Sequence, residues 1–204
     1  MNTAKQHWDK IYSNKKEEEQ SWFQPYPKTS VAFIDHFKLP TSANIIDIGG
    51  GDSRLADALL EKGFKNTWVL DISSRAIERA KTRLGNKASA VHWVVSDVLD
   101  FSPTIQFDLW HDRAAFHFLT SPDKVNAYVA VAEKYIKKDG ILILGTFSES
   151  GPKKCSGLDI KKYSPTTLSS CFEKSFERIR CMEEGHTTPF NTVQDFLFCS
   201  FRRK

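Results

Sequence analysis

Three consecutive glycines stand between an apolar segment and a helical pattern, where a backbone turn could enclose a ligand. The apolar run Ile45–Ile48 leads into Gly49, Gly50 and Gly51, and apolar residues recur at helical spacing over 55–60. This order predicts a buried strand, a tight turn and the start of a helix. Glycine allows the positive φ angles of such a turn, and the N–H groups of a helix start attract a carboxylate or a phosphate.

Two residues separate this turn from the fingerprint of dinucleotide-binding proteins. That fingerprint has a third glycine where the helix packs on the strand, and Arg54 occupies this place. Asp47 lies inside the strand, where a carboxylate would repel a pyrophosphate but could hold an amine, directly or through water. Both departures favour a zwitterionic ligand without phosphate over NAD. S-adenosylmethionine (SAM), an amino acid joined to a ribose and an adenine, has that chemistry.

Two further acids follow the next two apolar runs. Asp71 ends the run 67–71, 20 residues after Gly51, where a carboxylate can accept both hydroxyl protons of a ribose. Asp97 follows the run 90–95 and could accept from an adenine amino group. Alternatively, Asp71 only supplies charge to the helix that begins near Ser73, and Asp97 only caps a turn. The order and spacing of the three acids favour ligand binding.

Aromatic residues concentrate in the first 30 positions. Trp8 and Tyr12 fall on one face of a short predicted helix, and Trp22 stands in an aromatic segment, 21–27, with two prolines. The charged stretch 15–20 between them is expected to be mobile. The aromatics either pack a terminal arm onto the core or form a lid that excludes water and stacks on a sulfonium cation.

The remaining chain alternates strand and helix patterns. Helices are expected over 28–38, 73–84 and 122–137 and from Ser164, and strands over 45–48, 67–71, 90–95, 107–110, 141–147, 176–182 and 194–201. This order predicts an α/β fold with a doubly wound, seven-stranded, mostly parallel Rossmann-like sheet. A C-terminal hairpin adds an antiparallel strand. One domain, 1–204, is expected, with an N-terminal arm or lid (1–30), a cofactor-binding core (40–147) and a substrate loop with closing strands (148–204).

Bulk properties narrow the class of protein. The chain has 204 residues, 40% hydrophobic residues and a net charge of +4 spread along its length, which gives little basis for nucleic-acid binding. It contains no run of about 18 apolar residues, and residues 1–10 lack an apolar signal core. A soluble, cytoplasmic protein is expected. Its four cysteines form no C-x-x-C pair, so neither a zinc site nor a disulfide framework is expected, and Cys171, Cys181 and Cys199 are expected in the core.

Four segments taken together resemble the class I (seven-strand) SAM-dependent methyltransferases: 47–51, 69–71, 96–98 and 137–140. The resemblance covers about residues 40–147. It implies SAM as cofactor, with its amino-acid part on the glycine turn, its ribose on the second-strand acid and its adenine on the third-strand acid. The implied cofactor site comprises Trp22, Asp47, Gly49, Gly50, Gly51, Ser53, Asp71, Ile72, Asp97 and Val98.

Two narrower resemblances point to different acceptors. The segments 8–9, 21–23, 51–53 and 71–73 are similar to the branch that contains the elongation-factor and citrate-synthase lysine methyltransferases. The segment 110–114 is similar to the Trp-Asp-Arg-Gly-Ala stretch of thiopurine and related thiol methyltransferases, with His111 inserted. The acceptor therefore stays open between a protein lysine and a small molecule.

Methyl transfer from a sulfonium is an in-line displacement, in which a protein aligns the acceptor and excludes water. His111 and Asp112 are the candidates to orient or deprotonate the acceptor. The alternative is that His111 packs near the adenosine and that Asp112 forms a structural ion pair with Arg113. Further candidate substrate contacts are Trp8, Tyr12, Arg113, Cys155 and His186.

The leading hypothesis is an active methyltransferase, monomeric or homodimeric, that acts on a small molecule. The short chain has no separate recognition domain, and a lid would close over a small pocket. A protein-lysine methyltransferase and a SAM-binding module without catalysis are the alternatives. No metal, membrane or nucleic-acid partner is expected.

Overall fold

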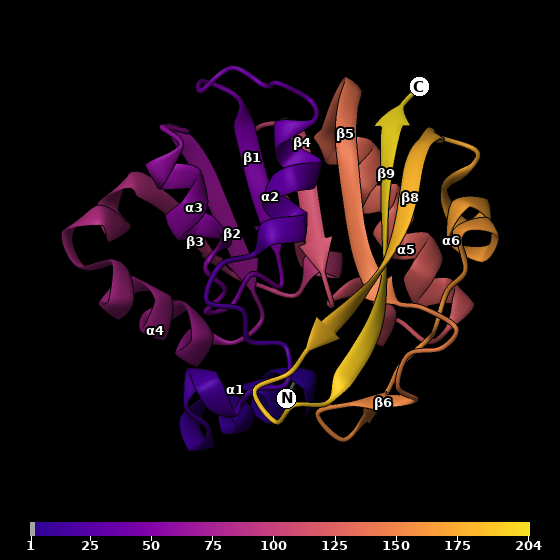
Figure 1. Ribbon diagram of the computed structural model, residues 1–204. Helices are drawn as coiled ribbons and strands as arrows, with labels where there is room; N and C mark the ends of the chain where they lie inside the picture. Colours follow the sequence, from indigo (N-terminus) through magenta and orange to yellow (C-terminus); the bar gives the residue numbers. More distant parts are fainter. Residues whose placement is uncertain (1–2) are drawn as a thin grey trace.

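The computed structural model describes residues 3–204 and places seven strands in one sheet, in the order β3-β2-β1-β4-β5-β9-β8 (Figure 1). β1 to β5 run parallel, whereas β9 is antiparallel to β5 and β8 is antiparallel to β9. The strand bounds are β1 Asn44–Ile48, β2 Asn66–Asp71, β3 Val91–Val95, β4 Phe107–Arg113, β5 Ile136–Phe147, β8 Phe176–Thr187 and β9 Val193–Arg203. The predicted doubly wound, mostly parallel sheet is confirmed.

Helices cover both faces of the sheet because strand residues alternate between two apolar surfaces. Ile45 packs in a core with α2 and α3, and Ile46 packs in a second core with α5 and α6. Serines at positions 73, 121 and 164 accept hydrogen bonds from the first turns of α4, α5 and α6, as N-caps do. The helix bounds are α1 Thr3–Asn14, α2 Lys28–Asp35, α3 Leu55–Glu61, α4 Ser74–Leu84, α5 Pro122–Tyr135 and α6 Pro165–Phe172.

The C-terminal half differs from expectation in its strand boundaries. β5 begins at Ile136, so the predicted turn at 138–140 lies within the strand, beside a register shift against β4. β8 and β9 extend almost to their connection, which leaves 188–192 as the turn. The expected loop 148–163 contains a small hairpin, β6 (Lys154–Cys155) and β7 (Leu158–Asp159). Within residues 3–204, no helix is long and apolar enough to span a bilayer.

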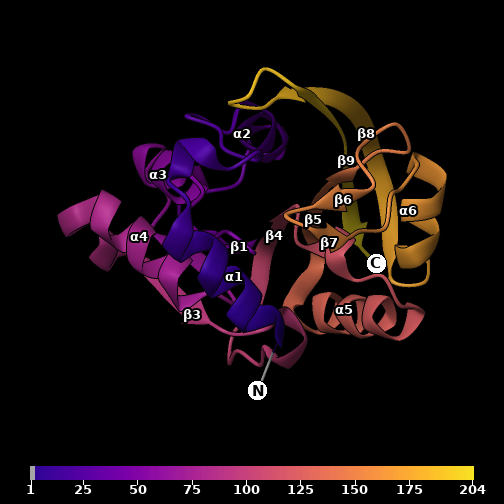
Figure 2. The ribbon, with the colours of Figure 1, turned by 90° about the horizontal axis from the view of Figure 1, so that it is seen from below.

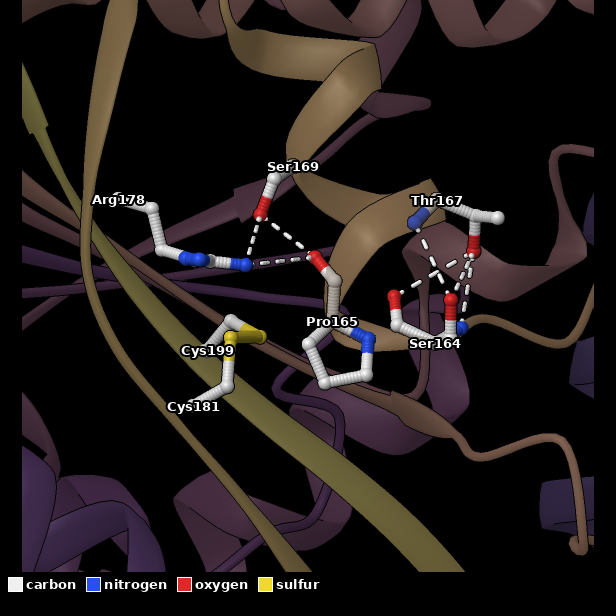
Figure 3. The surroundings of a disulfide bond; sticks show 7 residues. All are labelled: Ser164, Pro165, Thr167, Ser169, Arg178, Cys181 and Cys199. Atoms are coloured by element: carbon white, nitrogen blue, oxygen red, sulfur yellow. Dashed lines mark hydrogen bonds between the residues drawn. A yellow bond between two sulfur atoms is a disulfide. The ribbon is translucent and has the colours of Figure 1, made fainter.

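A disulfide joins Cys181 of β8 to Cys199 of β9 (Figure 3), so the prediction of no disulfide was wrong. The two residues face each other in the antiparallel register, with their Cα atoms 4.1 Å apart. Direct partners in an antiparallel pair bring their Cβ atoms within bridging distance. Cys199 lies in the core as predicted, whereas Cys171 and Cys181 are only half-buried.

Candidate functional site

Two adjoining cavities lie at the carboxyl ends of the parallel strands. The larger has a volume of about 320 Å³ and the smaller about 50 Å³, the former being within the size range of ligand pockets. Both are lined by Tyr12, Trp22, Gly49 and Arg113, so they meet between the arm and the sheet. Figure 2, which looks onto this edge, shows α1 in front of β1 and β4, with the β6–β7 hairpin beside it.

The glycine turn is tight, as its sequence predicts. Gly49 and Gly51 have φ angles of 62° and 50°. A Cβ atom on Gly49 would lie 2.6 Å from Cβ of Ala115, and one on Gly50 would lie 2.6 Å from Oδ2 of Asp47. The turn therefore needs glycine for its backbone angles and for close packing.

Asp47 lines the small cavity and is held from two sides. Its Oδ2 accepts a hydrogen bond from the Ser53 hydroxyl at 3.0 Å, and its Oδ1 lies 2.7 Å from Nδ1 of His111. Nε2 of His111 lies 2.9 Å from the hydroxyl of Ser30, a residue of α2 that the sequence did not single out. Both ring nitrogens of this buried histidine therefore have internal partners. This geometry suits His111 to orienting Asp47, not to deprotonating an acceptor.

Asp71 and Asp97 both line the large cavity, together with Ile72 and Val98. Oδ1 of Asp71 accepts from the backbone N–H of Ser73 at 2.7 Å, and burial raises the pKa of Asp71 to about 7. Oδ1 of Asp97 accepts from the backbone N–H of Leu99 at 3.0 Å. Each acid therefore makes the contact expected of a purely structural residue, at a helix start for Asp71 and in a turn for Asp97. Each also faces the cavity.

Asp112 lines neither cavity, and groups of the protein engage both of its carboxylate oxygens. Its Oδ1 accepts from the backbone N–H groups of Ala115 and Phe116, and its Oδ2 accepts from the Tyr128 hydroxyl at 2.7 Å. Burial raises its pKa to about 6. These contacts stabilise the turn after β4 from the α5 side. The alternative ion pair with Arg113 is also absent among residues 3–204.

Aromatic residues of the arm form the roof of the large cavity. The Trp8 ring packs edge-on against Trp22 and Phe118, with ring centroids 5.9 Å and 5.1 Å apart. Tyr12 packs against Trp22 at 6.3 Å. The arm is therefore packed on the core and also covers the cavities. Its aromatic residues are thus placed both as a packed arm and as a lid, the two alternatives that the sequence left open.

The charged stretch of the arm, 15–20, is anchored to the core by ion pairs, which its sequence did not predict. Glu17 begins a 3₁₀ turn and pairs with Arg54 at 2.8 Å and with Arg83 at 3.1 Å. Arg83 also donates to the backbone carbonyls of Asp52 and Ser53, directly after the glycine turn. Arg79, one helical turn earlier, donates to the carbonyls of Tyr12 and Lys15. Arg79 and Arg83 share one face of α4. Their spacing is visible in the sequence, but the sequence does not show which groups they bind.

The remaining predicted substrate residues differ in whether they line a cavity. Cys155 lines the large cavity from the β6–β7 hairpin, and burial raises its pKa to about 11. His186 lines neither cavity; its Nε2 lies 2.8 Å from the backbone carbonyl of Ser21, so it fixes the arm to β8. Arg113 lines both cavities, and its Nη1 donates to the backbone carbonyl of Trp22 at 3.0 Å.

Part of the chain matches a known protein family. Residues 45–140 match the model of a family described as a methyltransferase domain. EEF1A lysine methyltransferase 2 of Homo sapiens is 24% identical over 160 residues, or 69% of this chain, which spans 66% of that relative's length. Nodulation protein S of Bradyrhizobium diazoefficiens is 33% identical over 78 residues, covering 38% of this chain and 37% of that protein.

Solved structures share the fold along almost the whole chain. A protein that converts a disulfide bond into a thioacetal group in echinomycin biosynthesis has a TM-score of 0.79, at 18% identity, covering 98% of this chain and 93% of that one. The N-methyltransferase NodS of Bradyrhizobium japonicum WM9, in complex with S-adenosyl-L-homocysteine (SAH), has a TM-score of 0.75 at 17% identity, with 99% of both chains covered.

Proposed function

Since the chain belongs to the class I (seven-strand, Rossmann-like) SAM-dependent methyltransferases, we propose that it transfers a methyl group from SAM to a small-molecule acceptor. The acceptor atom is a thiol, an amine or a carboxylate oxygen. The observation that carries the proposal is the position of three acids, Asp47, Asp71 and Asp97, along two adjoining cavities. They follow the order of the ammonium, the ribose and the adenine in one extended cofactor.

The side chains around the cavities fit that cofactor. Asp47 would accept from the ammonium group in the small cavity, which Gln20 also lines. The buried Gln20 amide hydrogen-bonds Asp52 and has a second N–H group. That amide would donate to the cofactor carboxylate. In the large cavity, Asp71 would accept from the ribose hydroxyls and Asp97 from the adenine amino group. SAM supplies an activated methyl group, so the residues mainly orient the reactants and exclude water.

The roof supports a small acceptor. Trp8, Tyr12 and Trp22 pack against one another over the cavity, and the β6–β7 hairpin contributes Cys155, Leu158 and Asp159 to its lining. A protein lysine would need an open channel through this roof. Aromatic rings that cover the cavity in this way favour a small acceptor that binds beneath them beside the cofactor.

A protein-lysine acceptor is the second candidate, because one relative is a lysine methyltransferase that acts on EEF1A. A SAM-binding module without catalysis is a third, since neither His111 nor Asp112 has the contacts of a free base. An amine that enters in its neutral form needs no strong base, so the absence of a free base is compatible with catalysis.

Titration calorimetry with SAM, SAH and NAD tests the cofactor. We expect SAM and SAH to bind and NAD to give no heat; the reverse result would refute the proposal. Incubation of the protein with methyl-labelled SAM and a cell lysate, followed by separation of metabolites from protein, tests the acceptor. Label in the metabolite fraction supports the small molecule, label in protein supports the lysine, and cofactor binding without transfer supports the module.

A further inference from the structure

The Arg113 guanidinium has hydrogen-bond donors that no protein group uses. The side chain as a whole is partly exposed, but its Nε and Nη2 are buried and lack a partner among residues 3–204. Only Nη1 is engaged, by the backbone carbonyl of Trp22. Buried donors on a charged group are costly when they are unpaired, so this edge of the guanidinium is suited to a ligand.

The Arg113 side chain stands where the two cavities meet. Its Cζ lies 4.7 Å from the centre of the Phe196 ring of β9, and the residue lines both cavities. Phe196 and Trp22 hold the guanidinium on the side of β9 and the roof. The group is therefore fixed before a ligand arrives, which reduces the entropy lost on binding.

From these contacts we infer that Arg113 binds a carboxylate of the methyl acceptor through its Nε and Nη2, an inference that rests on the proposed methyltransferase function. Nε and one Nη form a planar pair of donors that matches the two oxygens of a carboxylate. The large cavity is also lined by Asp71, Asp97 and Asp159, with Lys124 as its other basic residue. With all three acids ionised, this lining carries one net negative charge, so a ligand with a single negative charge meets less repulsion than a phosphate dianion.

The cofactor's own carboxylate has another donor. The buried amide of Gln20 lines the small cavity, on the side where Asp47 would hold the ammonium group. One of its two N–H groups serves Asp52, and the other is available to the cofactor carboxylate. Arg113 then remains for the acceptor. A carboxylate held by two N–H groups is a weak nucleophile, so the methylated atom is a separate amine or thiol of the same molecule.

The transfer balances without another reagent. The lone pair of a neutral amine or of a thiolate forms the bond to the methyl carbon while the sulfur–methyl bond breaks, and that electron pair stays on sulfur. A methylated amine then releases its proton to water. The acceptor class is thus a small amino or mercapto acid, which a protein lysine side chain does not match.

Calorimetric titration of benzoate and benzamide into the SAH complex tests this assignment. We expect benzoate to bind, benzamide not to bind, and R113Q to weaken benzoate at least about tenfold, the size of a lost charged hydrogen bond. R113K should be intermediate, because an ammonium lacks the planar donor pair. The matched control is R180Q: Arg180 also stacks on a phenylalanine, Phe33 at 4.1 Å, and also has a buried unpaired Nε, but it lines neither cavity.

Methylation of paired acceptors provides a second readout. Thiosalicylate against thiophenol, and anthranilate against aniline, should each favour the acid at least about tenfold in kcat/KM, and R113Q should abolish the preference. Equal rates for acid and neutral partners, or equal binding of benzoate and benzamide including no binding of either, would overturn the inference. So would an R113Q variant that loses affinity for SAH but not for decarboxylated SAM. Failure of the wild-type protein to bind SAH would instead refute the proposed function.

Discussion

Nδ1 of His111 lies 2.7 Å from Oδ1 of Asp47, and the two residues are direct partners in the register of β1 and β4. The contact orients the acid that precedes the glycine turn from the neighbouring strand. Nε2 extends the chain to Ser30 of α2, so three elements fix one carboxylate. This arrangement assigns His111 to positioning and leads to the first prediction.

Substitution of His111 by alanine should weaken SAM binding and leave the chemical step almost unchanged. Loss of a buried hydrogen bond to a charged group corresponds to about 1.5–3 kcal/mol, or about 10–150-fold in Kd. Calorimetry measures this, and single-turnover rates at saturating SAM provide the comparison. H111N, which can keep one hydrogen bond, should recover part of the affinity. A large fall in the single-turnover rate, with loss of one limb of its pH profile, would show that His111 is instead a base.

The affinity for SAM should fall as the pH decreases below about 7. Burial, together with the nearby charges of Asp52 and Asp47, raises the pKa of Asp71 to about 7. Because only the carboxylate accepts both ribose hydroxyls, protonation of Asp71 competes with the cofactor, up to about tenfold per pH unit. Calorimetry from pH 5.5 to 8.5 should show this slope, and D71N should bind weakly with a flatter profile. An unchanged slope in D71N would assign the titration to another group.

The raised pKa of Asp71 also leads to a prediction for the stability of the protein without ligand. Its pKa is raised from 3.8 in the unfolded chain, so the native state binds the proton more tightly. The Asp71 contribution is therefore fully present below pH 3.8 and is lost as the pH rises through about 7. Chemical denaturation of D71N should show a weaker decline in the free energy of unfolding over this interval. A decline as steep as in the wild type would contradict the assignment.

Substitution of Gly49 by alanine should abolish cofactor binding while the fold is kept. A residue with a side chain is disfavoured at φ 62° by about 1–2 kcal/mol, and its Cβ would lie 2.6 Å from Cβ of Ala115. G63A is the matched control, because Gly63 also has a positive φ, 83°, but a Cβ there meets only Thr41 at 3.8 Å. Calorimetry with SAH and circular dichroism separate the two effects. Normal SAH affinity in G49A would show that the turn has room to adjust.

Substitution of the two acidic partners of Arg83 should affect two different properties of the protein. Glu17 belongs to the arm and Asp57 to α3, and both carboxylates pair with the same guanidinium. E17Q should release the arm, with faster proteolysis within residues 15–20 and roughly tenfold weaker SAM binding. D57N should lower the free energy of unfolding by about 1 kcal/mol and leave the arm protected.

K81M is the control for both variants, because the pair of Lys81 with Glu78 lies on the exposed side of α4. We expect K81M to change the free energy of unfolding by no more than about 0.5 kcal/mol and to leave the rate of proteolysis unaltered. Equal proteolysis of E17Q and the wild type would show that Glu17 does not retain the arm.

The sheet, and the position of three acids at one edge of it, could be predicted because they depend on local patterns. Asp47 inside the first apolar run, Asp71 at the end of the second and Asp97 after the third come to one sheet edge in any parallel alternation. The partners of His111 and Asp112 depend on which face each β4 side chain occupies. The period of two puts them on opposite faces, but the sequence does not reveal what packs there.

Other features could not be predicted because they depend on how segments that are far apart in the sequence align with each other. Cys181 and Cys199 lie within the predicted strands, but they are opposite each other only in the register that the turn 188–192 sets. Glu17 meets Arg83 through the path of the arm across α4. Neither pairing has a spacing motif, and each brings together residues that no shared secondary-structure element relates.

The packed aromatic roof over the cavities also determines how a cycle of reaction ends. Trp8 and Trp22 touch each other and Phe118 touches Trp8, so these rings cover one side of a ligand in the large cavity. We expect product departure to involve a motion of residues 3–27, which can be slower than the bond exchange beneath them. We expect the first turnover to be faster than the steady state and the steady state to slow in viscous solvent.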